Sequence, residues 1–271
     1  MTKNSATGTF WDHLDELRSI LLKISGVALL FAVVAFLFKD IIFAIVFAPK
    51  NDSFITYRWL ENIGGLFSGS SDEGFDVSLI NTGLAQQFII HMKTAFCFGI
   101  LFTSPYILYQ IFRFVSPALY EDERKYAVQT VGWGYLMFLT GVMIGYLLIF
   151  PLTFRFLGTY QVSSEVVNLI SLDSYMSTLI LICMAMGVVF ELPVVCWIFA
   201  KMGFLNVNFM KKYRKHSLVA ILIIAAIITP TSDVFTLLAV SLPMYLLYET
   251  SILLVALTEK RRACNSPLLE V

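Results

Sequence analysis

The sequence is poor in charged residues, and their signs balance. Only 14% of the 271 residues are Asp, Glu, Lys or Arg, and the formal net charge is +0. Without an excess of positive charge there is no global field to attract nucleic acid. The apolar share of 58% exceeds that of ordinary soluble domains. Together these values exclude both a nucleic-acid-binding protein and an ordinary soluble domain, and they indicate an integral membrane protein.

Motifs that hold metals, haem or nucleotides are also missing. The sequence contains no CxxC, Walker, HExxH or GxSxG pattern. The histidines and cysteines stand singly, and we interpret the cysteines as small packing residues: His13, His91, His216, Cys97, Cys183, Cys196 and Cys264. We therefore expect no cofactor, no metal site and no enzymatic activity.

Six apolar runs predict an all-α, polytopic membrane protein that forms a single domain over residues 1–271. About 20 residues cross a hydrocarbon core of about 30 Å, at about 1.5 Å per residue. The predicted spans are 20–38, 88–115, 128–154, 176–200, 217–228 and 234–257. The fifth run reaches only about 18 Å. The last two runs are therefore either two short crossings or a re-entrant hairpin.

The segments between the runs predict loops. Residues 39–87 form a long polar excursion, and its Gly- and Ser-rich middle indicates a flexible loop with short helices possible on either side. Residues 155–168 predict a short external loop, and residues 201–216 predict a basic loop. We assign Pro49, Pro230 and Asp233 to turns on the external side.

The distribution of Lys and Arg predicts the orientation in the membrane. Six crossings place both termini on the same side, and that side carries fourteen Lys and Arg residues against five on the other. This excess predicts cytoplasmic termini. The orientation stays the same if the last two runs form a re-entrant hairpin.

A charged segment follows the second span at its predicted cytoplasmic end. Pro117 disfavours a helical conformation for the residue before it and has no N–H, so the helix should end near Val115. Five consecutive charges, residues 121–125, come directly afterwards. One interpretation is a solvated loop that connects two helices.

Two glutamates are expected at this boundary, Glu16 before the first span and Glu123 after the second. A carboxylate half-shielded by lipid and protein needs a cation. Arginine suits it well, because the guanidinium fork binds a carboxylate through two hydrogen bonds. Either a bound ligand supplies these arginines, or Arg18 and Arg124 pair with the glutamates internally.

Glu191 is an acid within the fourth predicted span. A charge there costs about 2.5–3.5 kcal/mol on insertion scales, so such residues are usually functional or form interhelical contacts. Pro193 should kink the helix nearby. A secondary transporter that uses Glu191 as a proton carrier is an alternative, although the related halves with broken helices typical of transporters are not found in the sequence.

Four segments, in order from about Thr9 to about Leu257, resemble the TatC family, the multi-spanning core of the twin-arginine protein translocase. His13–Arg18 (HLDELR) resembles that family's HLxELR signature. Phe190–Pro193 (FELP) is similar to its fourth-helix motif. The other two segments resemble its first cytoplasmic loop and its last hairpin through Ser104-Pro105, Tyr109-Gln110, Phe114–Leu119, Glu123–Lys125, Thr229-Pro230, Asp233, Pro243–Tyr245 and Glu249. The sequence departs from the family pattern at Ala118, where Gly is common, in its long first external segment, and at Thr231-Ser232.

The resemblance implies a receptor for twin-arginine signal peptides in the bacterial inner membrane. Six helices would form a cupped surface with Glu191 on its concave face, and the protonmotive force would drive export of folded proteins. The expected partners are TatA-type and TatB-type single-span proteins, signal peptides and further copies of the chain. The residues implied for signal-peptide binding are Glu16, Arg18, Phe114, Pro117, Glu123 and Arg124, and those for contacts within the membrane are Glu191, Tyr245 and Glu249.

Overall fold

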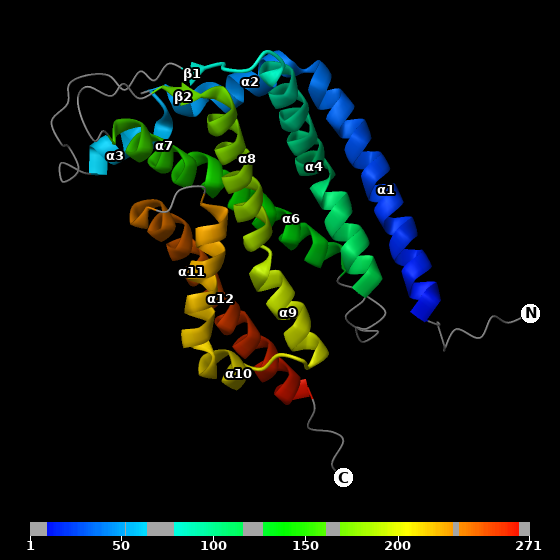
Figure 1. The fold of residues 1–271 in the computed structure, drawn as a ribbon. Coiled ribbons are helices and arrows are strands. Elements are labelled where there is room, and N and C mark those ends of the chain that lie inside the picture. The colour runs from blue at the N-terminus through cyan, green and yellow to red at the C-terminus, as the bar shows by residue number, and fades with distance from the viewer. Residues whose placement is uncertain are drawn as a thin grey trace, which may run out of the picture. The chain divides into compact units, whose positions relative to one another are not determined.

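The computed structural model describes residues 10–51, 53–63, 79–115, 127–160, 169–229 and 233–265, and most of them are helical (Figure 1). The helical elements are α1 (Phe10–Leu37), α2 (Lys39–Phe47), the 3-10 turn η1 (Ala48–Lys50), α3 (Ile55–Ile63), α4 (Gln86–Val115), α6 (Ala127–Ile144), the π-helical segment η3 (Gly145–Ile149), α7 (Phe150–Thr159), α8 (Leu172–Val189), α9 (Leu192–Met202), α10 (Val207–Lys212), α11 (Arg214–Ile228) and α12 (Val234–Asn265). The predicted all-α class is confirmed.

Among the residues that the structure describes, five helical stretches are long and apolar enough to cross a membrane. They are Leu14–Leu37, Gln86–Phe114, Thr130–Thr159, Leu172–Met202 and Val234–Lys260. The remaining predicted span forms α11, whose 15 residues reach about 22 Å at about 1.5 Å per residue. The count of six crossings therefore stays a prediction.

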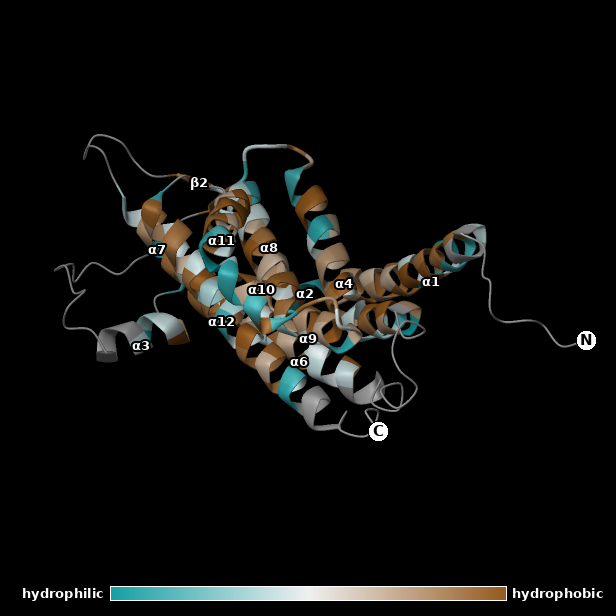
Figure 2. Ribbon diagram, turned by 90° about the horizontal axis from the view of Figure 1, so that it is seen from below, coloured by the Kyte–Doolittle hydropathy of each residue, from teal (hydrophilic) through white to brown (hydrophobic). Residues whose placement is uncertain are grey.

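Large apolar side chains cover the outside of these helices. On α1, Leu29, Leu30 and Leu37 are each more than half exposed, and hydrophobic residues predominate along the long helices in Figure 2. An apolar surface of this extent would be a liability in water. On a helix that spans a membrane, lipid covers it.

The chain divides into two compact units, which are described separately. The first comprises residues 1–39 and 91–135, and the second comprises residues 40–90 and 136–271. In the first unit, α1 and α4 pack antiparallel. The ring of Phe36 stacks on His91 with centroids 4.0 Å apart, and Phe31 meets Phe102 at 6.3 Å.

Gly99 allows α1 and α4 to approach closely. A Cβ atom at this position would lie 2.8 Å from both the carbonyl oxygen of Ala28 and the backbone nitrogen of Ala32. Backbone atoms cannot move aside as a flexible side chain can. Small residues at helix contacts are the usual means of close packing in membranes.

Gly99→Ala is therefore expected to destabilise the first unit by about 1–3 kcal/mol, the usual cost of overpacking. Gly26→Ala on α1 is the matched control, because a Cβ atom there meets nothing within 4 Å. Alanine favours helix more than glycine does, so the control should be neutral or slightly stabilising. Thermal unfolding of both variants in a mild detergent measures the difference, and equal midpoints would contradict this packing.

In the second unit, α6 and η3 pack on α8 through glycines. A Cβ atom on Gly141 would lie 2.5 Å from the carbonyl oxygen of Met186, and one on Gly187 would lie 2.8 Å from the ring of Phe138. This contact brings α6 against the last turn of α8. The contact with α6 therefore holds the end of α8, which lies two residues before Glu191.

Hydroxyl groups anchor α2, η1 and α3 to the rest of the second unit. Pro151 has no N–H, so it cannot donate a helical hydrogen bond to the carbonyl oxygen of Leu147, four residues earlier. The Thr56 hydroxyl donates to that oxygen instead. Three tyrosine hydroxyls donate to further carbonyl oxygens: Tyr146 to Ile45 at 2.6 Å, Tyr175 to Val46 at 2.9 Å, and Tyr57 to Pro49 at 3.1 Å and to Pro151 at 3.3 Å. Pro49, expected in a turn, is buried in η1.

The predicted loops are partly wrong. Residues 155–159 continue α7, although a loop was expected from residue 155. The short helix α10 lies within the expected basic loop, after Gly203 has ended α9 in the left-handed conformation with φ 83°. Two short strands, β1 (Leu79–Ile80) and β2 (Ile170–Ser171), pair in parallel and were not anticipated. Short helices were expected as possible on either side of the Gly- and Ser-rich segment. α2 and α3 lie on its N-terminal side. Residues 64–78 lie outside the described residues.

Candidate functional site

Glu16 and Arg18 lie near the beginning of α1, and both side chains are exposed. The contacts of Phe36 with His91 and of Phe31 with Phe102 fix the antiparallel register of α1 and α4. Continuing this register places Glu16 level with the last described turn of α4, which contains Phe114. Because the described residues stop at Val115, the predicted helix end near this residue stays a prediction. The remaining residues of this predicted site, Pro117, Glu123 and Arg124, lie outside the described residues.

Glu191 lies where the helical path between α8 and α9 is broken. α8 ends at Val189, two turn residues follow, and α9 begins at Leu192 with Pro193 in its first turn. A proline ring clashes with the carbonyl four residues earlier, here that of Val189. The predicted kink is therefore present, and Glu191 sits at the break itself.

The carboxyl group of Glu191 is incompletely satisfied. Glu191 is half-buried, and the buried Oε1 atom of its carboxyl group has no hydrogen-bond partner among the residues that the structure describes. A buried oxygen without a partner is costly. The arrangement suits a hydrogen bond from a group on another molecule.

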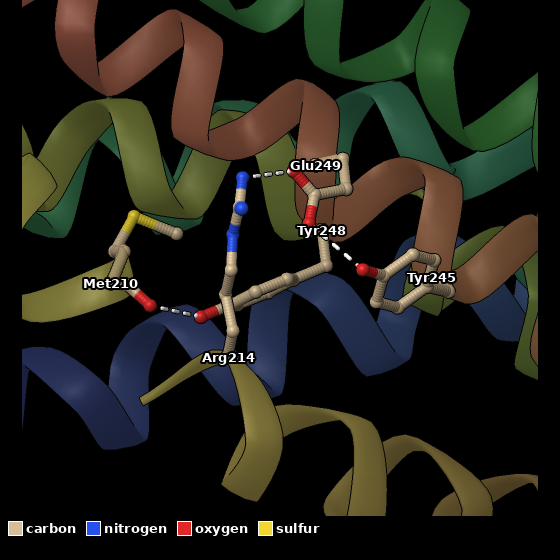
Figure 3. Close-up of polar contacts among 5 residues, drawn as sticks. All are labelled: Met210, Arg214, Tyr245, Tyr248 and Glu249. Carbon is tan, nitrogen blue, oxygen red and sulfur yellow. Dashed lines mark hydrogen bonds and ion pairs between the residues drawn. The ribbon is translucent and has the colours of Figure 1, made fainter. Parts of the chain in front are cut away.

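A second polar cluster joins α11 and α12 (Figure 3). An Arg214 guanidinium nitrogen (Nη2) lies 2.6 Å from Oε2 of Glu249, and the Tyr245 hydroxyl donates to Oε1 of the same carboxylate at 3.0 Å. Tyr245 and Glu249 stand four residues apart, so they share one face of α12. The sequence had singled out both residues but did not identify Arg214, which it assigned to the basic loop. These bonds of Glu249 do not involve Glu191, so the structure does not join the three predicted intramembrane residues into one site.

Asp233 begins the last helix. It immediately precedes α12, and its Oδ2 atom accepts hydrogen bonds from the backbone N–H of Thr236, at 2.7 Å, and from the Thr236 hydroxyl. An aspartate in this position is a good N-cap. Its predicted neighbour Pro230 lies outside the described residues.

The structure shows no candidate metal centre within the part of the chain that it describes, since no three His, Cys, Asp or Glu side chains gather there. The polar groups in view are two exposed charges on α1, one half-buried acid at a helix break, and an ion pair between two helices. These groups can bind charged or hydrogen-bonding partners, and no nucleophile with an adjacent base stands among them.

Comparison with known proteins identifies the family. A family model described as "Sec-independent protein translocase protein (TatC)" matches residues 12–243. A protein named TatC from Blattabacterium sp. subsp. Periplaneta americana (strain BPLAN) is 31% identical over 258 residues, covering 93% of this chain and 97% of that protein. Another, from Koribacter versatilis (strain Ellin345), is 34% identical over 249 residues, covering 90% and 83%.

Two solved structures have the same fold. The crystal structure of the twin arginine translocase receptor TatC matches with a TM-score of 0.73 and 30% identity, over 91% of this chain and 99% of that one. A second structure of this receptor, in DDM, gives a TM-score of 0.74 and 30% identity, over 89% of this chain and 98% of that one. With a family model that spans most of its length, similar relatives and this shared fold, the chain belongs to the TatC family of Sec-independent protein translocase proteins.

Proposed function

We propose that this chain is the core receptor of a twin-arginine translocase and binds twin-arginine signal peptides at its cytoplasmic face. The observation that carries the proposal is the exposed Glu16 at the beginning of α1, level with the end of α4 and so near the start of the segment that contains Glu123. Two carboxylates at a membrane boundary complement two guanidinium groups. The relative of known structure is named as a twin arginine translocase receptor, which supports the same role.

Phe114, Pro117, Arg18 and Arg124 complete the proposed binding site. The aromatic ring and the proline offer apolar contacts to the signal peptide, while the two arginines hold the glutamates when no peptide is bound. Exchange of these internal partners for the peptide's arginines keeps each carboxylate paired. Such an exchange avoids leaving a charge without a partner at the membrane boundary.

A pull-down tests this function. The protein in membranes should retain a twin-arginine signal peptide and lose most of it when lysines replace both arginines. Lysine is a point charge and cannot reproduce the bidentate fork. Equal retention of the two peptides would overturn the proposed receptor role.

The wider assembly follows from the family. Single-span TatA-type and TatB-type proteins and further copies of this chain are the proposed partners, and the protonmotive force is the proposed energy source for export of folded proteins. Glu191, whose buried oxygen has no hydrogen-bond partner in the described part of the chain, is the proposed contact for a partner helix within the membrane. Tyr245 and Glu249 are proposed as a second contact of this kind, held in place by Arg214.

We place the protein in the bacterial inner membrane with both termini in the cytoplasm, and α11 and α12 as two crossings. α11 spans about 22 Å, so the bilayer beside it must thin, at a cost of fractions of a kcal/mol per ångström. Thin bilayer would ease the passage of a polar chain, as a translocase requires.

Cysteine labelling tests the crossing by α11. In a variant whose native cysteines have been replaced, Ser232→Cys should react with an external, membrane-impermeant reagent and not with one confined to the cytoplasm. A cysteine in place of the exposed Lys215 at the other end of α11 should show the opposite pattern and serves as the control. Labelling of both positions from the cytoplasm would mean a re-entrant hairpin.

A further inference from the structure

A group of exposed basic and aromatic side chains lies on α10, on the turns that flank it and at the beginning of α11. We call it the basic platform, and its residues are Phe204, Phe209, Lys211, Lys212, Tyr213 and Lys215. All six side chains are exposed, and the three aromatic ones are exposed by 77%, 54% and 38% in this order. Hydrophilic residues gather around α10 in Figure 2.

The platform has a fixed support. The opposite face of α10 presents Val207 and Met210, which pack in one buried cluster with Ile252 and Val255 of α12. The Tyr248 hydroxyl donates to the Met210 carbonyl oxygen at 2.9 Å (Figure 3). Burial of one face and this bond at its end hold α10 in a defined orientation. The exposed Phe209, Lys211 and Lys212 of α10 are thus already arranged before any ligand arrives.

The acids of α12 that reach this region are already engaged. Glu249 pairs with Arg214 at 2.6 Å, and Glu259 accepts a hydrogen bond from the backbone N–H of Val207 at 3.0 Å. In the sequence, no acidic residue stands between Glu191 and Asp233. The platform therefore presents the charges of Lys211, Lys212 and Lys215 as a local positive surface, although the whole chain is neutral.

The surroundings of the platform are those of a membrane boundary. It connects the end of one apolar helix, α9, to the beginning of another, α11. Its aromatic rings lie beside its charges, with the ring centroids of Phe209 and Tyr213 4.6 Å apart and the Lys212 Nζ 5.8 Å from the Tyr213 ring centroid. Aromatic residues among lysines at the ends of membrane helices are typical of segments in contact with the headgroup layer.

We propose that the basic platform binds the headgroups of anionic phospholipids. Lys211, Lys212 and Lys215 contact the phosphates, and the aromatic rings lie at the boundary between headgroups and acyl chains. Juxtamembrane clusters of lysine attract anionic lipid in this way. An acidic protein segment would satisfy the lysines as well, but it would leave the exposed rings of Phe204 and Phe209 without an apolar environment.

Lipid binding here would act on the short helix α11. The platform leads directly into α11, and the ion pair of Arg214 with Glu249 ties that end of α11 to α12. Headgroups held at the platform would therefore fix the depth of this end in the bilayer. Because α11 is short, the bilayer would then have to thin so that the opposite leaflet meets the other end of α11.

Trp197 provides a local probe of this site. It lies on α9, and the Nζ atom of Lys201 is 4.5 Å from its ring centroid. A full-length variant with Trp11, Trp59 and Trp133 changed to Phe retains Trp197 as its single tryptophan. Reconstituted in bilayers with brominated phosphatidylglycerol or brominated phosphatidylcholine, it reports by quenching which lipid lies near the platform.

Quenching should show a preference for phosphatidylglycerol of about fivefold or more, because one lysine near an anionic surface contributes about that factor. Lys211→Gln, Lys212→Gln and Lys215→Gln together should reduce the preference to near one. The matched control carries three charge removals elsewhere, Lys39→Gln, Lys50→Gln and Arg58→Gln, and should keep the preference. High salt should weaken it, since screening shortens the reach of exposed charges.

Two results would overturn the proposal. One is equal quenching by the two lipids in the chain with an intact platform. The other is an unchanged preference for phosphatidylglycerol in the variant that lacks the three lysines. If the intact platform instead retained an acidic protein segment while showing no lipid preference, the surface would belong to a protein partner and the lipid proposal would fail.

Discussion

Glu16→Ala and Glu123→Ala should each weaken binding of a twin-arginine signal peptide by about 30-fold or more. Truncating one partner of a desolvated, hydrogen-bonded charge pair typically has an effect of at least this size. Much of the loss arises because the peptide's arginine is left without its carboxylate at the membrane boundary. Binding of a labelled signal peptide to the protein in detergent or nanodiscs measures the effect.

The neighbouring Asp15 supplies the control for Glu16. It is also an exposed carboxylate on α1, but one residue of helix turns it about 100° away from Glu16. Asp15→Ala should therefore bind the peptide nearly as the unchanged protein does. Equal losses in Asp15→Ala and Glu16→Ala would indicate a general effect of negative charge, and unchanged binding in both glutamate variants would remove the proposed site.

Features set by local chemistry could be predicted from the sequence. Pro193 predicted the interruption that the structure shows before α9. The ring of proline acts on the backbone within four residues of itself. Long apolar runs identified the membrane-length helices for the same reason, because length and hydrophobicity are properties of a single segment.

Features that depend on distant parts of the chain could not be predicted in the same way. Arg214 and Glu249 lie 35 residues apart, and a basic residue in a charged segment gives no sign of which acid it will meet. The short helix α10 is stabilised chiefly by packing on α12, because an isolated six-residue helix is unstable in water. From the sequence alone, this segment was therefore predicted to be a loop.

The sequence identified residues of the candidate site but could not give their geometry. An acid within an apolar run marks Glu191 as exceptional, since burying a charge in lipid is costly. The sequence could not show that one carboxyl oxygen of Glu191 is buried without a partner among the described residues. Burial of this oxygen depends on how distant segments pack, and α6 packs against the last turn of α8 at Gly141.

Glu191→Gln should retain appreciable export of a twin-arginine cargo, whereas Glu191→Ala should lose most of it. Glutamine keeps the size and the hydrogen-bonding capacity that a partner helix needs. Alanine leaves the partner's polar group unpaired in hydrocarbon, at about 1–2 kcal/mol by model-peptide values, which corresponds to about a 5- to 30-fold loss of partner binding. Export is compared among the unchanged protein, Gln and Ala at equal protein levels in the membrane.

The two variants also separate a hydrogen bond from a proton carrier. A proton-coupled secondary transporter would need Glu191 to titrate, so Gln would fail as completely as Ala. The other acid on α8 and α9 is Asp173, about 27 Å away along the helical path at about 1.5 Å per residue, too far for direct proton transfer. We therefore expect the hydrogen bond to be the function of Glu191. Equal failure of Gln and Ala would instead favour proton carriage, and full export by Ala would remove Glu191 from the mechanism.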